Sequence, residues 1–228
     1  MATTMRPVSA TRLAIFDCDG TLVDSQANII AAMADAFDRN GMVPPDPNAT
    51  RRIVGLSLVE GMQVLLPDAD AGLHTKLAGD YKNAFHLLRG NGGLMPEPLY
   101  PGIAECLLEL EARGWLLAVA TGKSDRGLAL ILAHHGLAGH FISLQTADRH
   151  PSKPHPSMIH AAMLDAGVDA LHTAMIGDTH FDIEMAVNAR VRPIGVDWGY
   201  HHPEELRAAG AVAVVAHVEA LMAALEDL

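Results

Sequence analysis

Two acidic residues separated by one position follow a short apolar run near the start of the chain. Asp17 and Asp19 come directly after residues 13–16, Leu-Ala-Ile-Phe, and are followed by Gly-Thr. In an extended chain alternate side chains point the same way, so both carboxylates would lie on one side and Cys18 on the other. Carboxylates this close repel each other unless a cation lies between them, and a divalent ion with oxygen ligands, most naturally Mg²⁺, meets that need. The pair therefore predicts a metal-dependent site, against the alternative of two acids that only cap a turn.

A second acidic pair occurs much later in the sequence. Asp178 follows an apolar run and a glycine, and Asp182 comes four positions after it. Side chains four residues apart lie on the same face of a helix, so both carboxylates would point the same way if this segment is helical. Acidic residues also favour helix N-termini for electrostatic reasons alone. Beside Asp17 and Asp19, however, we expect the two pairs to belong to one site.

Residue types that bind anions occur at two further places. Thr121 and Gly122 end an apolar run and open a predicted helix, where backbone N–H groups and a hydroxyl form an anion site. Lys153 is one of only four lysines in the chain, and Pro151 and Pro154 stiffen its loop. Each signal is weak alone, because Thr-Gly often forms a plain turn and most loop lysines are solvated. Together with the carboxylates they indicate a single site.

The elements that must position these residues alternate between apolar runs and helical patterns. Strands are predicted at residues 13–16, 115–120, 141–144, 173–176, 191–196 and 211–216. The longer helices between them are predicted at residues 103–113, 124–135, 156–166 and 181–189. Wholly apolar strands in repeated strand–helix units predict an α/β fold with a Rossmann-like parallel sheet covered on both faces. Ligands of such sheets bind beyond the carboxyl ends of the strands, which is where the candidate residues occur.

A helical block interrupts this pattern after the first strand. Helices are predicted at residues 25–40, 58–66 and 71–88, and three prolines between residues 44 and 47 predict a rigid break after the first of them. We therefore expect two domains, an α/β core formed by residues 1–21 and 98–228 and an inserted helical cap formed by residues 22–97.

Composition narrows the class of protein. The 228 residues include 16 basic and 27 acidic side chains, a net charge of −11, with 50% hydrophobic residues. This content excludes a disordered chain, and the acid excess argues against nucleic acid or an anionic membrane as the main partner. Two distant cysteines exclude a disulfide scaffold and fit a reducing compartment. The first ten residues lack the apolar segment of a signal peptide, so we expect a cytoplasmic protein.

Other common motifs of enzyme sites do not occur in the sequence. It contains no G-x-G-x-x-G, no G-x-x-x-x-G-K-[ST], no G-x-S-x-G and no H-E-x-x-H. Dinucleotide-binding, P-loop, serine-hydrolase and zinc-protease interpretations therefore lack support.

Taken in order, the motifs resemble those of the haloacid dehalogenase superfamily. The first is Asp-Cys-Asp-Gly-Thr at residues 17–21, the second is Thr-Gly at 121–122, the third is Lys-Pro at 153–154, and the fourth is Gly-Asp-Thr-His-Phe-Asp at 177–182. Within that superfamily the chain is most similar to the phosphoglycolate-phosphatase-like phosphohydrolases that carry a helical cap after the first motif. The resemblance covers nearly the whole chain, and the ordered set is specific although each later motif is short.

The resemblance implies a different role for each of the four aspartates. Asp17 would attack phosphorus and form an aspartyl-phosphate, and Asp19 would protonate the leaving oxygen and later activate water. Mg²⁺ would be held by Asp17, by the backbone carbonyl of Asp19 and by Asp178. Asp182 would support this set by orienting Lys153 or a metal-bound water.

The resemblance also implies which residues bind the phosphoryl group. Thr121, the Gly122 N–H and Lys153 would hold its oxygens, and the cap would close over the site and select the substrate. In the cap, Arg51 or Arg52 could grip a substrate carboxylate, although a solvated helix arginine is at least as good an interpretation.

These roles predict a Mg²⁺-dependent phosphatase that acts on a small phosphorylated metabolite, with phosphoglycolate as the best guess. Alternatives within the superfamily are a sugar-phosphate phosphatase, a pyrophosphatase or a phosphoglucomutase-like mutase. Leu58 disfavours the mutase, because mutases carry a basic residue there. A metal-free dehalogenase does not need the acid at Asp19, and a phospho-accepting receiver domain is about half this length and lacks a cap. The sequence leaves the oligomeric state between monomer and homodimer.

Overall fold

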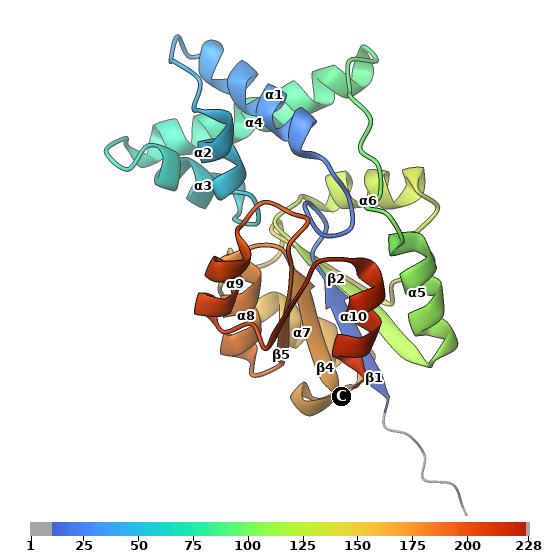
Figure 1. The fold of residues 1–228 in the computed structure, drawn as a ribbon. Helices are drawn as coiled ribbons and strands as arrows, with labels where there is room; N and C mark the ends of the chain where they lie inside the picture. The colour runs from blue at the N-terminus through green and yellow to red at the C-terminus, as the bar shows by residue number, and fades with distance from the viewer. Residues whose placement is uncertain (1–10, 227–228) are drawn as a thin grey trace, which may run out of the picture.

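Six parallel strands form a sheet at the centre of the computed structural model, which describes residues 11–226 (Figure 1). The strands are β1 (Arg12–Phe16), β2 (Trp115–Thr121), β3 (Ser143–Thr146), β4 (Thr173–Gly177), β5 (Arg192–Val196) and β6 (Ala213–Val215). Their order across the sheet is β3-β2-β1-β4-β5-β6, which confirms the predicted α/β fold with a parallel sheet. The chain proceeds outward from β1 in both directions, so the topological switch point, where ligands of such sheets bind, lies beside β1.

Helices cover both faces of the sheet, and β1 shows why. Its side chains alternate, so that Ala14 and Phe16 enter one apolar cluster while Leu13 and Ile15 enter another on the opposite face. The first cluster is completed by α5 (Ile103–Ala112), α6 (Asp125–His134) and α10 (Val218–Leu225). The second is completed by α7 (Ser157–Ala166) and α8 (His180–Ala189), with α9 (Pro203–Ala209) packed beside α8.

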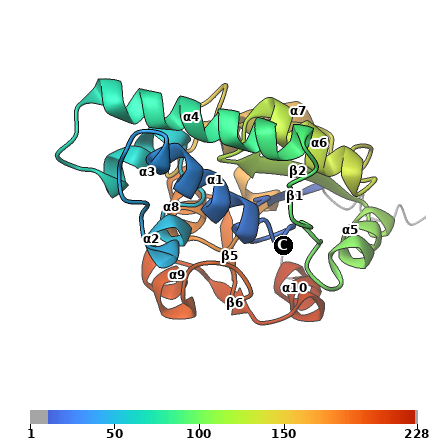
Figure 2. The ribbon, with the colours of Figure 1, turned by 90° about the horizontal axis from the view of Figure 1, so that it is seen from above.

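Four helices lie between β1 and α5 in the sequence and sit over the carboxyl ends of the strands (Figures 1 and 2). They are α1 (Gln26–Asp38), α2 (Pro47–Arg52), α3 (Leu58–Leu65) and α4 (Ala71–Gly90). α1 and α4 lie side by side, and α1, α3, α4 and the residue directly after α2 share an apolar cluster that includes Met33, Phe37, Ile53, Met62 and Leu77. This group therefore carries a core of its own above the sheet edge. The proposed limits of a separate cap domain, residues 22–97, stay a prediction.

The sequence pattern missed one of these helices. The prolines between residues 44 and 47 predicted a rigid break, but α2 begins at Pro47. Proline suits the first position of a helix, because its fixed φ is helical and its missing N–H would have no partner there. Asp46 completes the start by accepting a hydrogen bond from the Asn48 N–H at 2.8 Å.

The longest helix, α4, has 20 residues, among them polar and charged side chains. Within residues 11–226, no helix combines the length and the apolar content needed to cross a membrane.

Candidate active site

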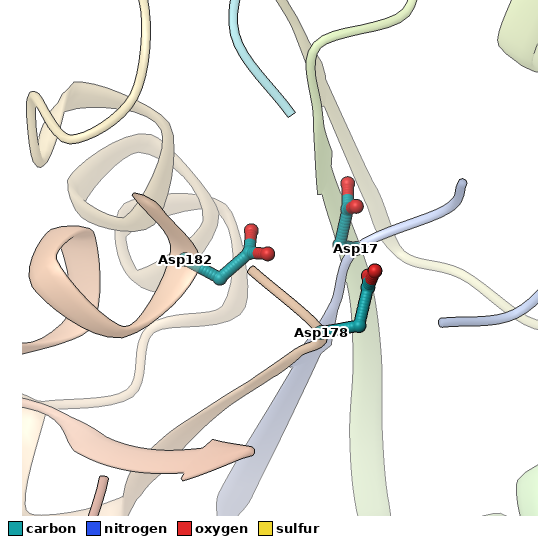
Figure 3. Close-up of side chains that lie close together, drawn as sticks. All are labelled: Asp17, Asp178 and Asp182. Carbon is teal, nitrogen blue, oxygen red and sulfur yellow. The ribbon is translucent and has the colours of Figure 1, made fainter. Parts of the chain in front are cut away.

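The ends of β1 and β4 bring three aspartates together. Asp17 follows β1, Asp178 follows β4, and Asp182 lies in the first turn of α8. β1 and β4 are neighbouring strands with Phe16 opposite Ile176, a register that places Asp17 beside Asp178. One carboxylate oxygen from each aspartate lies within 4.8 Å of the other two, and all three residues are buried (Figure 3). The structure thus gathers three of the four predicted aspartates into one cluster.

Lys153 reaches this cluster from the loop after β3. Its ammonium nitrogen lies 2.8 Å from Oδ1 of Asp17 and 2.6 Å from Oδ1 of Asp182, and the residue is only 1% exposed. Burial alone would lower the pKa of Lys153, but the charges of the two aspartates more than offset this and raise it above its usual range. Lys153 therefore stays a fixed positive charge beside the predicted nucleophile.

Asp182 is held from both sides. Its Oδ1 accepts from Lys153, and its Oδ2 accepts hydrogen bonds from the N–H of Thr179 at 3.1 Å and from the Thr179 hydroxyl at 2.7 Å. The second set forms a capping box at the start of α8, with Thr179 as the N-cap residue. Both oxygens of Asp182 are therefore engaged by protein groups, and the supporting role that the resemblance implies stays a prediction.

Asp178 is fixed by Thr21 and by the backbone of Tyr200, neither of which the sequence singles out as a site residue. Its Oδ1 accepts from the Thr21 hydroxyl at 2.8 Å, and its Oδ2 accepts from the Tyr200 N–H at 2.9 Å. The backbone packs so closely that a Cβ on Gly20 or Gly199 would lie 2.2 Å from an Asp178 atom. Thr21 belongs to the first motif, but nothing in the sequence indicates that the loop after β5 reaches this carboxylate.

The donor set of the cluster fits a divalent cation. Oδ2 of Asp17 is buried and has no hydrogen-bond partner in the described part of the chain. Burial raises the pKa of Asp17, although Lys153 acts in the opposite direction, and burial together with the charge of Asp182 raises the pKa of Asp178. Three buried carboxylates thus face one buried ammonium, so the cluster lacks positive charge and offers oxygen ligands of the kind that Mg²⁺ prefers.

Asp19 lies apart from this cluster. Its Oδ1 is 2.6 Å from the ammonium of Lys123 and accepts a hydrogen bond from the Ser25 hydroxyl. Cys18, between the two acids, points into the apolar core, whereas Asp17 and Asp19 line the same cavity. The predicted alternation of side chains thus holds along this loop. That the Asp19 carbonyl binds a metal stays a prediction.

The predicted phosphate-binding residues lie at the end of β2. Thr121 is buried, and its hydroxyl accepts a hydrogen bond from the Lys123 N–H at 3.2 Å. Gly122 is covered by the loop between α2 and α3, because a Cβ there would lie 2.6 Å from the Leu56 carbonyl oxygen and 2.8 Å from that of Gly55. The four-helix group and the sheet edge therefore meet directly over this segment.

A cavity of about 440 Å³ lies between the strand ends and the helices above them. At its floor are Asp17, Asp19, Thr121 and Gly122, and its walls come from α1, α4, α6 and the loop between α2 and α3. A cavity of this size is in the range that binds small organic ligands. Of the predicted site residues, Lys153, Asp178 and Asp182 are not part of this lining, and Lys153 contacts the cavity residue Asp17 directly.

The structure places Arg51 and Arg52 outside the lining of the cavity, and the idea that one of them grips a substrate carboxylate stays a prediction beside the alternative of a solvated arginine. Arg51 donates to the side chains of Gln26 at 2.9 Å and Asn48 at 2.7 Å. Arg52 of α2 forms an ion pair with Glu205 of α9 at 2.5 Å, and both side chains are partly exposed. Because α2 starts at Pro47, both arginines fall in its last turn, where the structure gives them other partners.

Comparison with known proteins agrees with this geometry. The family model for "Haloacid dehalogenase-like hydrolase" matches residues 14–196. The chain is 37% identical to "Probable phosphatase IndB" of Dickeya dadantii, over 89% of this chain and 88% of that protein. It is 30% identical to "Phosphoglycolate phosphatase" of Vibrio parahaemolyticus, over 86% of this chain and 88% of that one.

A solved structure shares the fold over nearly the full length of both chains. The crystal structure of a protein described as a predicted phosphatase, from Clostridium acetobutylicum, superposes with a TM-score of 0.86. The two chains are 27% identical, and the match covers 96% of this chain and 100% of the other. The family match and the phosphatase relatives agree with the ordered motifs and the parallel sheet. The protein is a phosphatase that hydrolyses phosphoric monoesters. The chain belongs to the haloacid dehalogenase-like hydrolase family.

Proposed function

We propose that this phosphatase is a Mg²⁺-dependent phosphomonoesterase that works through an aspartyl-phosphate on Asp17. The observation that carries the proposal is the environment of Asp17. One of its oxygens accepts from Lys153, while the other is buried and without a protein partner among residues 11–226. A rigidly held carboxylate with an unused oxygen, at the floor of a cavity, suits a nucleophile that works beside a cation.

The proposed reaction has two steps. In the first, an Asp17 oxygen forms a bond to phosphorus as the bond between phosphorus and the ester oxygen breaks, and Asp19 donates a proton to the departing alkoxide. In the second, Asp19 takes a proton from a water molecule that attacks the same phosphorus, which releases inorganic phosphate and restores the Asp17 carboxylate. Support for the second role comes from the position of Asp19, which lines the same cavity as Asp17.

The remaining residues would bind and orient the phosphoryl group. The Thr121 hydroxyl, the Gly122 N–H and the Lys153 ammonium are proposed to hold its oxygens, and Asp182 would keep Lys153 in place. Asp17, the Asp19 carbonyl and Asp178 would hold Mg²⁺, which when bound neutralises negative charge on the carboxylates and on the transferring group. Support for this set comes from the buried cluster around Asp17, in which three carboxylates face a single ammonium group.

We infer that the substrate is a small phosphorylated metabolite. Phosphoglycolate is the first compound to test, because several relatives that are 28–33% identical carry the name "Phosphoglycolate phosphatase". The relative that is 37% identical carries the broader name "Probable phosphatase IndB", so the identity of the ester is open within this class.

Release of inorganic phosphate from a panel of small phosphate esters tests this function. We expect turnover with Mg²⁺ and loss of turnover when EDTA removes the metal, with recovery when Mg²⁺ is returned. Phosphate release that survives EDTA would contradict the metal-dependent mechanism. Stable phosphorylation of Asp17 without turnover would favour a phospho-accepting domain.

A further inference from the structure

Glu97 lines the cavity from a segment whose backbone is tied to the neighbouring loops. It lies in residues 91–102, the segment that returns from α4 to α5. Its carbonyl accepts a hydrogen bond from Nε2 of His135 at 2.8 Å, and the next residue, Pro98, accepts from the Asp24 N–H at 2.9 Å. A β-bridge between Val23 and Leu99 ties the same segment to the loop that carries Asp17 and Asp19. The backbone of Glu97 is therefore anchored to the site.

The side chain of Glu97 has an unused acceptor. The residue lines the cavity and is only 9% exposed, yet its Oε1 is buried and has no hydrogen-bond partner within the described residues. A buried acceptor that is left unpaired is unfavourable, because it has lost its water without gaining a partner. Two other carboxylates that line the cavity have partners in the protein, since Asp19 pairs with Lys123 and Asp148 pairs with Lys82. Glu97 thus offers a carboxylate oxygen that a ligand could satisfy.

The walls of the cavity are largely apolar, although charged side chains of α4 and α6 also line it. The apolar residues include Met33 of α1, Ile53 and Leu56 of the segment after α2, Phe85 of α4 and Ile131 of α6. A volume of about 440 Å³ far exceeds what the two-carbon glycolate group needs once its phosphate is bound at the floor. Largely apolar walls with a small number of placed polar groups are typical of a site for an organic ring with a directed hydrogen bond.

We propose that Glu97 is a specificity-determining residue that accepts a hydrogen bond from an N–H or O–H donor on a ring-bearing leaving group. This proposal rests on the proposed phosphatase function and names the kind of ester that the site prefers. A charged acceptor forms hydrogen bonds about twice as strong as a neutral one, most of all with a cationic donor. The same charge disfavours a leaving group that carries a carboxylate, so phosphoglycolate is a poorer substrate than a donor-bearing ring ester.

Matched synthetic esters test this directly with the full-length enzyme and Mg²⁺. The panel contains benzyl phosphate, its 3- and 4-aminomethyl derivatives, which add a cationic donor at two positions, and phosphoglycolate. We expect wild-type kcat/KM for the better aminomethyl ester to exceed that for benzyl phosphate by about tenfold or more, the equivalent of one good charged hydrogen bond. Glu97→Gln should remove most of that preference, leave benzyl phosphate within about twofold and raise kcat/KM for phosphoglycolate.

A matched control separates a hydrogen bond from a general charge effect. Asp148→Asn also removes one negative charge from the lining of the cavity, but from a side chain that Lys82 already pairs. We expect this variant to keep the wild-type ratio between the aminomethyl and benzyl esters. If instead Glu97→Gln changes kcat/KM for every ester by the same factor, or Asp148→Asn lowers the ratio as much, Glu97 has only a structural or general electrostatic role and the proposal is overturned.

The specificity proposal for Glu97 and the proposed phosphatase function can be told apart by their outcomes. If the wild-type enzyme releases phosphate but treats the aminomethyl and benzyl esters alike, the specificity proposal falls while the phosphatase function stands. If no ester yields phosphate with Mg²⁺, the proposed function is overturned, and the role of Glu97 with it.

Discussion

The ammonium of Lys153 lies 2.8 Å from the carboxylate of Asp17, and both side chains are shielded from solvent. The same ammonium lies 2.6 Å from Asp182, so one buried cation holds two buried anions. A buried ion pair adds little stability relative to an apolar pair, but removing one partner leaves an uncompensated charge in the interior. Lys153 therefore fixes the predicted nucleophile, and the integrity of the site depends on it.

Replacement of Lys153 should damage both stability and activity. Lys153→Met leaves Asp17 and Asp182 without their shared partner, so we expect the free energy of unfolding in urea to fall by about 3–5 kcal/mol. We also expect phosphate release to fall by about 100-fold or more, because the nucleophile loses its orientation. Lys82→Met is the control, since its pair with Asp148 is half-exposed and should cost less than about 1 kcal/mol. Equal effects of the two substitutions would contradict this account of Lys153.

Gly20 should be needed for the position of Asp178. Its φ is +89°, and a Cβ would lie 2.2 Å from Oδ2 of Asp178. Gly20→Ala should therefore displace that carboxylate, and we expect the Mg²⁺-dependent activity to fall by about tenfold or more. Gly41 also has a positive φ, of +65°, but nothing lies within 4 Å of a Cβ there. Gly41→Ala should share the backbone strain of about 1 kcal/mol and keep its activity. Loss of activity in both variants would point to strain alone.

His201 should make stability depend on pH. Its Nδ1 accepts a hydrogen bond from the His180 N–H at 3.2 Å, which requires the unprotonated nitrogen. Burial, together with the charge of Arg52, lowers the pKa of His201 from 6.5 to about 4. The unfolded chain then binds the proton more readily, so the contribution to stability is complete above pH 6.5 and is lost as the pH falls toward 4.

The loss in that window should reach about 3 kcal/mol at most, since a pKa difference of one corresponds to about 1.4 kcal/mol. His201→Gln removes the titrating group, so the free energy of unfolding of this variant should depend less on pH across the window than that of the wild type. Urea denaturation at a series of pH values measures both slopes. Parallel slopes would show that His201 does not titrate with the shifted pKa.

Arg52 should matter little for catalysis. Its ion pair with Glu205 is partly exposed, with the arginine side chain 44% accessible, so Arg52→Gln should cost less than about 1 kcal/mol of stability. Because Arg52 does not line the cavity, we expect KM for phosphoglycolate to change by less than about twofold. A large rise in KM would instead support the prediction that this arginine grips a substrate carboxylate.

The sequence predicts the fold and the floor of the site because both depend on local pattern. The chain shows its apolar strands, the polar residues that follow them and the order of the motifs directly in its sequence. Parallel strands then bring their carboxyl ends to one edge of the sheet. Asp17, Thr121 and Asp178 therefore fall where the pattern places them, as the residues that follow or end β1, β2 and β4.

What the sequence does not predict depends on contacts between distant segments. The Tyr200 N–H reaches Asp178 from the loop after β5, and backbone donors carry no sequence signal. Lys123 follows the Thr-Gly pair of the second motif, and its ion pair with Asp19 needs the fold to bring the loops after β1 and β2 together. Glu97 cannot be singled out from the sequence. Its proposed role rests on a buried Oε1 without a hydrogen-bond partner among the described residues, and this is a property of packing.

The central claim is that Asp17 becomes phosphorylated during turnover. Mass spectrometry of peptides from enzyme quenched in acid during hydrolysis tests it most directly, with Asp17→Asn as the comparison. We predict a phosphate adduct on Asp17 of the wild-type enzyme, and neither an adduct nor turnover in a variant that remains folded. Phosphate release by Asp17→Asn at a rate close to that of the wild type, or an adduct on another residue, would contradict the account.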